Sequence, residues 1–365
     1  MPSNSEIRDA KRVLDKVINK ARVHFYKPIQ VAEILYRSRT RGDIDVSDLE
    51  SYRSPSKKWR DDISRRLVGS ISTSSARYQD DVFNENAVPP QKLAILDAAN
   101  KAGSAIVENY IYHRMCQRWA LLPVIQNYLT ETRSEDFTLR EFLSKFERYP
   151  GLKRSIDKAY EIVVYALFRT LTKFLKIKVT ISIEESDEQV LSDFSDFMEV
   201  VIGIPRGSRQ KVFSAELHRL GVANAADLGL DMLCNFGPVI QVKHISFDPD
   251  VLEDVIEPLS MDKVIIVCLE SHRYNIEAVL AQIGFRDRIQ GIITDRDLER
   301  WYELALGKYR DKLANLLFRE LSSEFRREFP HIERAEEFLR ERGYQREALI
   351  GMWELPAETS EQMLS

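Results

Sequence analysis

Three polar residues, Asp231, Gln241 and Lys243, interrupt an apolar stretch of the chain, GLDMLCNFGPVIQVKHIS at residues 229–246. Carboxylate and amide oxygens are hard ligands that Mg²⁺ accepts, and an ammonium group beside them offsets negative charge. Hydrolysis of a phosphodiester needs such groups, because it requires an activated water and a stabilised anionic transition state. Taken singly, Asp231 is more often a turn residue and Lys243 a surface lysine.

Short strands must position these groups. Apolar residues on both sides of Gly237-Pro238 predict a hairpin with strands at residues 231–236 and 239–245. Side chains alternate between the two faces of a strand, so Gln241 and Lys243 share one face. A three-residue loop ending at the proline would place the acid opposite the lysine and keep all three groups together, whereas a two-residue loop would separate them.

The polar residues of this hairpin predict a divalent metal site, with Mg²⁺ as the expected ion. Asp231 would be the carboxylate ligand, Gln241 would offer its amide carbonyl, and the backbone carbonyl of Val242 would add a third oxygen. Lys243 would orient or deprotonate the attacking water. A strand interior gains no stability from a lysine next to an amide and an acid, so a functional site explains the trio better than packing does.

The same residues carry a resemblance. Gly229-Leu230-Asp231, the hairpin and Gln241-Val242-Lys243 resemble the metal-binding core of the PD-(D/E)xK nuclease superfamily, and the glutamine is similar to the Mrr-like variant. The segments KPIQVAEILYRSR (27–39) and KKWRDD to STSSARYQD (57–80) resemble type II restriction endonucleases of the HaeII kind. The resemblance implies an α/β fold, with a restriction-endonuclease-like mixed sheet flanked by helices, and a target like purine-GCGC-pyrimidine.

Gln241 departs from the commonest pattern of this superfamily, which has an acid at that position. A neutral amide binds Mg²⁺ less well than a carboxylate, so we expect a further acid nearby. By analogy with relatives that place an acid on the preceding helix, Glu216 is the first choice, on a helix predicted at residues 210–220, and Asp227 is the second. Glu216 could equally be a surface acid paired with Arg219.

Length and composition bound the remaining possibilities. The chain has 365 residues, of which 44% are hydrophobic, so we expect two packed modules. Its three cysteines lack CxxC spacing, which argues against a disulfide framework or a zinc site and fits a reducing cytoplasm. No apolar run is long enough to cross a bilayer, so we expect no membrane partner.

The periodicity of apolar residues changes along the chain. Residues 1–175 read as a series of helices and predict a largely α-helical domain for DNA recognition and dimerisation. Strands then alternate with helices, which predicts the catalytic domain at residues 176–310. Charged helices and a flexible tail after Pro356 would complete the chain at residues 311–365.

The charges are unevenly distributed. Residues 1–180 carry a net charge of +10 and residues 181–365 one of −14, so the first half could hold phosphates while the second binds cations. Such blocks can also simply keep a surface solvated. Within the basic half, a helix at residues 56–68 and the small-residue segment after it offer donors to phosphates or base edges. The candidates are Lys57, Lys58, Arg60, Arg65, Arg66, Ser72, Ser74 and Arg77.

These features favour a type II restriction endonuclease that cuts double-stranded DNA at a short palindrome. Because a two-fold symmetric site suits a two-fold symmetric protein, we expect a homodimer. The chain has no HExxH, Walker or dinucleotide-binding motif, so we expect no nucleotide cofactor. Two alternatives remain: an Mrr-like nuclease acting on modified or branched DNA, and a non-catalytic DNA-binding protein with a vestigial hairpin.

Overall fold

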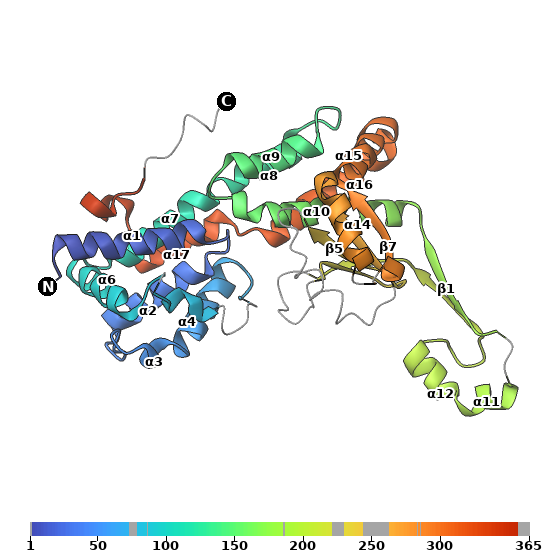
Figure 1. The fold of residues 1–365 in the computed structure, drawn as a ribbon, viewed down its shortest axis with the longest axis horizontal. Helices are drawn as coiled ribbons and strands as arrows, with labels where there is room; N and C mark the ends of the chain where they lie inside the picture. Colours follow the sequence, from blue (N-terminus) through green and yellow to red (C-terminus); the bar gives the residue numbers. More distant parts are fainter. Residues whose placement is uncertain are drawn as a thin grey trace. The chain divides into compact units, whose positions relative to one another are not determined.

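A computed structural model of the chain describes residues 2–72, 79–85, 87–184, 187–220, 230–243, 263–282, 284 and 286–356 (Figure 1). The described residues divide into two compact units. The first comprises residues 2–162 and 321–356, and the second comprises residues 163–220 and 230–320. The first unit thus combines the amino-terminal helices with residues 321–356.

The first unit is built from helices. The series of helices expected in residues 1–175 is present, because amphipathic periodicity and caps act together. In α1 the Ser3 side chain accepts from the backbone N–H of Glu6, whose carboxylate accepts from the Ser3 N–H. The helices of this part of the chain are α1 (Asn4–Lys20), α2 (Tyr26–Thr40), α3 (Leu49–Tyr52), α4 (Pro55–Leu67), η1 (Asp81–Phe83), α6 (Pro90–Ala102), α7 (Ile106–Trp119), α8 (Leu122–Glu131), α9 (Leu139–Arg148), η2 (Lys153–Ser155), α17 (Ile332–Arg342), η6 (Arg346–Ala348) and η7 (Gly351–Trp353). Two further helices, α10 (Ile156–Phe174) and α16 (Arg310–Glu328), contribute residues to both units.

Buried charges join the carboxy-terminal helix α17 to the amino-terminal helices. Glu108 is fully buried and accepts hydrogen bonds from the Arg39 guanidinium, at 2.9 and 3.0 Å, and from the Tyr344 hydroxyl. Glu33 is also buried and pairs with Arg342 at 3.1 Å. Buried carboxylates need such partners, because an unpaired charge in a protein interior is strongly destabilising.

The second unit contains a mixed five-stranded sheet in the order β3-β4-β5-β6-β7. The first three strands, β3 (Leu217–Arg219), β4 (Met232–Cys234) and β5 (Val239–Lys243), are antiparallel neighbours. Strand β5 then pairs in parallel with β6 (Val264–Cys268), which pairs in parallel with β7 (Ile289–Thr294). The middle strand of the sheet is therefore β5, which carries Gln241 and Lys243.

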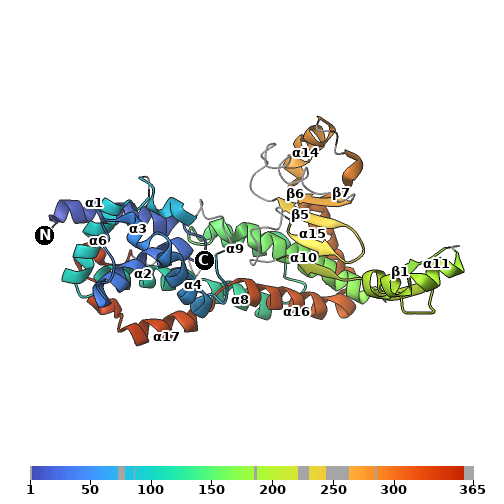
Figure 2. The same cartoon turned by 90° about the horizontal axis from the view of Figure 1, so that it is seen from below.

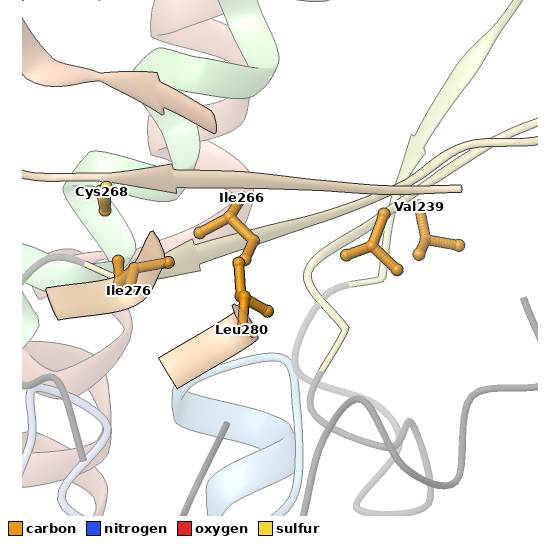
Figure 3. Packing of buried hydrophobic residues seen from close by; sticks show 6 residues of the cluster. Val239, Ile266, Cys268, Ile276 and Leu280 are labelled. Atoms are coloured by element: carbon orange, nitrogen blue, oxygen red, sulfur yellow. The ribbon is translucent and has the colours of Figure 1, made fainter. Parts of the chain in front are cut away.

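Helices cover both faces of this sheet (Figure 2). Helix α14 (Glu270–Gln282) connects β6 to the segment before η4 (Arg286–Arg288) and β7, and it packs on one face. Its Ile276 and Leu280 contact Val239, Val264, Ile266 and Cys268 of the sheet (Figure 3). On the other face lie α15 (Asp295–Glu303) and the part of α10 that begins at Val163, joined by a 2.8 Å hydrogen bond from the Tyr302 hydroxyl to the Val163 carbonyl. The π-helix η5 (Leu304–Lys308) follows α15.

The predicted helix at residues 210–220 is wrong. The structure has two strands there, β2 (Gln210–Ser214) and β3 (Leu217–Arg219). In β3 the side chains alternate between buried and exposed, which is the period of a strand. Local helix formers such as Ala215 and Glu216 are overruled because β2 and β3 pair with strands elsewhere in the chain.

Strand β2 pairs with β1 (Lys178–Ser182) in a separate two-stranded antiparallel ribbon. The described part of the insertion between the two strands contains α11 (Glu188–Asp193), α12 (Ser195–Phe197) and the π-helix η3 (Met198–Ile202) (Figure 1).

Removing the buried carboxylate of Glu108 tests the charge network of the first unit. We expect Glu108→Ala to lower the free energy of unfolding by about 3–5 kcal/mol, because it leaves the Arg39 guanidinium without its buried partner. The matched control is Asp62→Ala, which removes an exposed acid 3.5 Å from Arg65 and should change stability by less than about 1 kcal/mol. Urea unfolding of both variants measures the difference, and equal stabilities would contradict the assignment.

Candidate active site

The hairpin is present, but its register differs from the expected one by two residues. Leu233 pairs with Val239 and Met232 pairs with Ile240, so the acid does not face the lysine as predicted. The Cys234 N–H donates to the Pro238 carbonyl at 3.0 Å, which makes the three-residue loop residues 235–237. The odd loop length was predicted correctly, and only its position was wrong.

The loop position follows from contacts that are remote in sequence. Asn235 accepts a 2.9 Å hydrogen bond from the Glu216 N–H and donates a 3.0 Å hydrogen bond to the Ser214 carbonyl. Gly237 has a φ of 121°, a conformation that favours glycine. These two requirements place the turn one residue earlier than Gly237-Pro238 alone would suggest.

Asp231 lies directly before β4 and is fixed against β5 by two hydrogen bonds. Its N–H donates to the Ile240 carbonyl at 3.2 Å, and its carboxylate Oδ2 accepts from the Val242 N–H at 2.7 Å. The Asp231 carboxylate thus accepts the hydrogen bond that a backbone carbonyl would accept in a continued β-ladder. It contacts β5 at Val242, the residue between Gln241 and Lys243.

Gln241 and Lys243 point to the face of the sheet that α14 covers. Because successive side chains of β5 point to opposite faces, both lie on the same face as Val239, which packs against α14. Gln241 is buried and Lys243 is half-buried. In the parallel pairing Lys243 lies beside Cys268 of β6. Burial, together with the nearby carboxylates of Asp295 and Glu270, raises the pKa of the Cys268 thiol to about 12.

The structure does not bring Glu216 to these residues. Glu216 precedes β3 and lies level with Asn235, whose N–H donates to its carbonyl at 3.1 Å. Asp231 lies four residues further along β4, a separation of roughly 13 Å in a strand. The Glu216 side chain is exposed and lies 3.8 Å from His218, not beside Arg219. Both Glu216 and His218 line a separate cavity with Arg169 and Lys173.

Two acids that the sequence analysis did not single out lie at the carboxyl end of the sheet. Glu270 follows β6 and Asp295 follows β7, and the Glu270 N–H donates to the Asp295 carboxylate at 2.7 Å. Because Lys243, Cys268 and Thr294 are in register, these acids are at the same end of the sheet as the lysine. The signal in the sequence is an acid placed directly after an apolar strand, in VCLE and in IITD.

The oxygen donors of the hairpin fit a hard divalent cation. A strand residue directs its N–H and C=O to the same side, so the Val242 carbonyl points to the side from which the Asp231 carboxylate contacts the Val242 N–H. A carboxylate and carbonyl oxygens are the ligands that Mg²⁺ uses. Within the described ranges no three His, Cys, Asp or Glu side chains are grouped to hold a metal, so an ion here would depend on neutral oxygens as well.

The predicted DNA-binding helix is present as α4, but its basic residues differ in their environments. Lys58 and Arg65 are exposed, and Arg65 lies 3.5 Å from Asp62. Lys57 pairs with Asp80 at 2.8 Å, and Arg66 pairs with Glu341 at 2.5 Å. Lys58, Arg65 and Arg66 are thus the exposed basic residues of α4, and of these Arg66 is paired with Glu341 of α17.

Arg60 is buried, in contrast to its predicted role as a DNA contact. It is only 2% exposed, and its guanidinium donates to Gln30 at 3.2 Å, to Asp61 at 2.8 Å and to Gln79 at 2.9 Å. These contacts join α4 to α2 and to the segment before η1. Of the other candidates, Ser72 is half-buried, while Ser74, Arg77 and Asp227 lie outside the described residues.

The mixed sheet has helices on both faces, Gln241 and Lys243 on its middle strand, and the Asp231 carboxylate beside that strand, and it defines a protein with an α/β restriction-endonuclease-like core. Residues 10–344 match the model of the HaeII restriction endonuclease family, and the chain belongs to that family.

Two curated relatives are similar over most of their length. The chain is 46% identical to the type II restriction enzyme NgoBI of Neisseria gonorrhoeae over 343 residues, covering 93% of this chain and 97% of the relative. It is 45% identical to the type II restriction enzyme HaeII of Haemophilus aegyptius over 327 residues, covering 89% and 93%. No solved structure matches the chain. Among the helices of the described residues, none has the length and apolar character to span a membrane.

Comparing two neighbouring basic residues distinguishes structural from DNA-contacting roles on α4. We expect Arg60→Ala to lower the free energy of unfolding by about 3 kcal/mol, because the buried Gln30 and the partly buried Asp61 and Gln79 lose their donor. Lys58→Ala should change it by less than about 0.5 kcal/mol, because that side chain is exposed. Urea unfolding measures both, and a stability of Arg60→Ala equal to that of Lys58→Ala would show that the buried contacts are unimportant.

Proposed function

We propose that this protein is a type II restriction endonuclease that cleaves both strands of DNA at a short palindrome in a Mg²⁺-dependent reaction. The observation that carries the proposal is the Asp231 carboxylate held at the Val242 N–H, between Gln241 and Lys243, in a chain of the HaeII restriction endonuclease family. The printed names of both relatives, type II restriction enzymes, support it. The proposed target is like purine-GCGC-pyrimidine, as the resemblance implies.

Asp231, Gln241 and the Val242 carbonyl would hold the divalent cation. When bound, the cation would supply charge neutralisation and acidify a water molecule. Lys243 would orient or deprotonate the attacking water, and its charge would oppose the negative charge that develops on the phosphate. Because Lys243 is half-buried beside Cys268, its ammonium group acts in a less polar environment than an exposed lysine, and its electrostatic effect on a nearby phosphate is larger.

The amide of Gln241 leaves the metal site with fewer charges than one built from two acids. Glu216 remains the acid that the sequence favoured, but the four-residue separation from Asp231 along β4 does not support it. Glu270 and Asp295, at the carboxyl end of the sheet, are at the same end as Lys243. We therefore consider these two the better candidates for a supporting carboxylate.

A homodimer is the expected assembly, because a palindrome presents the same half-site twice in opposite orientations. Each copy would then cleave one strand. The exposed Lys58 and Arg65 of α4 would contact phosphates and so contribute affinity more than sequence discrimination.

Substitutions in the hairpin test the proposed chemistry. We expect Asp231→Ala and Lys243→Ala each to lower Mg²⁺-dependent cleavage of unmethylated plasmid DNA by at least about 10²–10³-fold, because each removes a charge acting on the transition state. DNA binding, measured without Mg²⁺, should be largely retained. The control is Glu277→Gln, which removes an exposed acid of α14 paired with Arg273 at 3.0 Å and should cleave normally.

The products of the same digest distinguish the three candidate functions. Discrete fragments with mapped ends in a common palindrome support the restriction endonuclease. Cleavage confined to methylated or branched DNA would favour an Mrr-like nuclease. No cleavage by the wild-type protein, together with no Mg²⁺ or Mn²⁺ binding in calorimetry, would favour a non-catalytic DNA-binding protein. Normal cleavage by either hairpin variant would end the assignment of the active site.

Charge reversal on α4 tests the DNA contact. We expect Lys58→Glu and Arg65→Glu each to weaken DNA binding and to reduce the salt dependence of the binding constant by about one phosphate contact, because fewer counterions are released. Arg133→Glu is the matched control, since it changes the charge of an exposed arginine outside α4. Binding measured at several salt concentrations gives the slope, and a wild-type slope for both α4 variants would rule out this surface.

A further inference from the structure

The described part of the insertion between β1 and β2 contains a helical rod that buries none of its own side chains. No residue of α11, α12 or η3 is buried. Hydrogen bonds continue through the junction, since the Phe194 N–H donates to the Val190 carbonyl and the Met198 N–H to the Phe194 carbonyl, both at 3.0 Å. Residues 188–202 are therefore a succession of helical turns with an interruption at Phe194, where φ is −104° and ψ is 23°.

One side of this rod is apolar and exposed. Val190, Phe194, Phe197 and Val201 follow one another at intervals of four, three and four residues, and are 52%, 58%, 48% and 63% exposed. Val200 beside them is 82% exposed. Spacing of this kind places side chains along one face of a helix and is the spacing by which two helices pack together. We call these five residues the apolar stripe.

The insertion does not cover the stripe itself. Leu191, Ser195 and Met198 line a cavity together with residues 205–209, so the rod turns these residues toward its own loop. At 3.6 residues per turn, these three residues lie roughly 100° around the helix from the stripe, so the contact with the loop leaves the stripe exposed. Large apolar side chains exposed side by side in this way mark an interaction surface more often than isolated ones do.

Charge argues against DNA as the partner of the stripe. Residues 187–202 contain five acids and no lysine or arginine, so a phosphate backbone would be repelled. Two of the acids pair within the insertion, Glu199 with Arg206 at 2.8 Å and Glu188 with Arg209. A protein surface is needed to cover the stripe.

The size of the stripe fits a second copy of itself. The two half-exposed phenylalanines and the three more exposed valines each leave on the order of 100 Å² accessible, so the five residues offer roughly 500 Å² per copy. Two stripes would together bury about 1,000 Å², which is the lower limit for a specific interface. A face with heptad spacing is complementary to the same face of another copy, because apolar side chains of one helix fill the spaces between those of the other.

We propose that the apolar stripe pairs with the apolar stripe of a second copy of this chain across a two-fold axis. This identifies the surface of the dimer and does not depend on the chemistry of the hairpin. If the stripe were not the interface, the nuclease assignment would stand, and if the hairpin were inactive, the pairing would still be measurable.

Sedimentation of the full chain tests the pairing. We expect Phe194→Asp and Val201→Asp each to raise the dimer dissociation constant by at least about 30-fold, because each buries a charge at the centre of an apolar contact. Ile350→Asp is the matched control, since Ile350 is an exposed apolar residue outside the insertion, 67% exposed, and the variant should dimerise normally. Unchanged melting temperatures confirm that the variants fold.

The wild-type protein provides a second measurement. Apolar pairing should persist or strengthen as sulfate is added, because excluded salts favour burial, whereas a dimer held by ion pairs would dissociate with rising salt. A monomeric wild-type protein, salt-induced dissociation, or wild-type dimerisation by both stripe variants would each overturn the proposal.

Discussion

The hydrogen bond from the Val242 N–H to the Asp231 carboxylate is the contact on which the candidate site depends. It replaces a rung of the β-ladder by a side chain, so the strand pairing that builds the sheet also fixes the acid. Displacing β4 along β5 would remove the acid from Gln241 and Lys243. Helix α14 packs on the face of the sheet to which Gln241 and Lys243 point, and its packing determines how much water reaches these two side chains.

Charged side chains have different surroundings in the two units. In the first, buried carboxylates such as Glu108 and Glu33 are paired with arginines, which holds helices from both ends of the chain together. In the second, the Asp231 carboxylate accepts a hydrogen bond from the backbone N–H of Val242, so the strand pairing holds this acid. Charge pairs in the first unit therefore link helices, whereas at the hairpin a charged group is held by a backbone donor.

The sequence predicted most helices, the α/β class and the hairpin, because periodicity and turn residues act locally. The predictions from the sequence were wrong where contacts between residues far apart in the chain determine the local structure. Residues 210–220 form strands because β1 and β4 pair with them, and the loop shifted because Asn235 contacts Glu216 and Ser214. The burial of Arg60 depends on Gln30 and Gln79, which no local pattern connects to it. The roles of the hairpin residues themselves stay predictions.

The position of β5 between an antiparallel and a parallel neighbour has a consequence for folding. Its pairing with β4 closes a three-residue loop, whereas its pairing with β6 joins Lys243 to Cys268, 25 residues away. Local pairings form faster than distant ones, because less chain entropy is lost. The acid and the amide would therefore meet early in folding, and the lysine would gain its buried neighbour only when the parallel strands assemble.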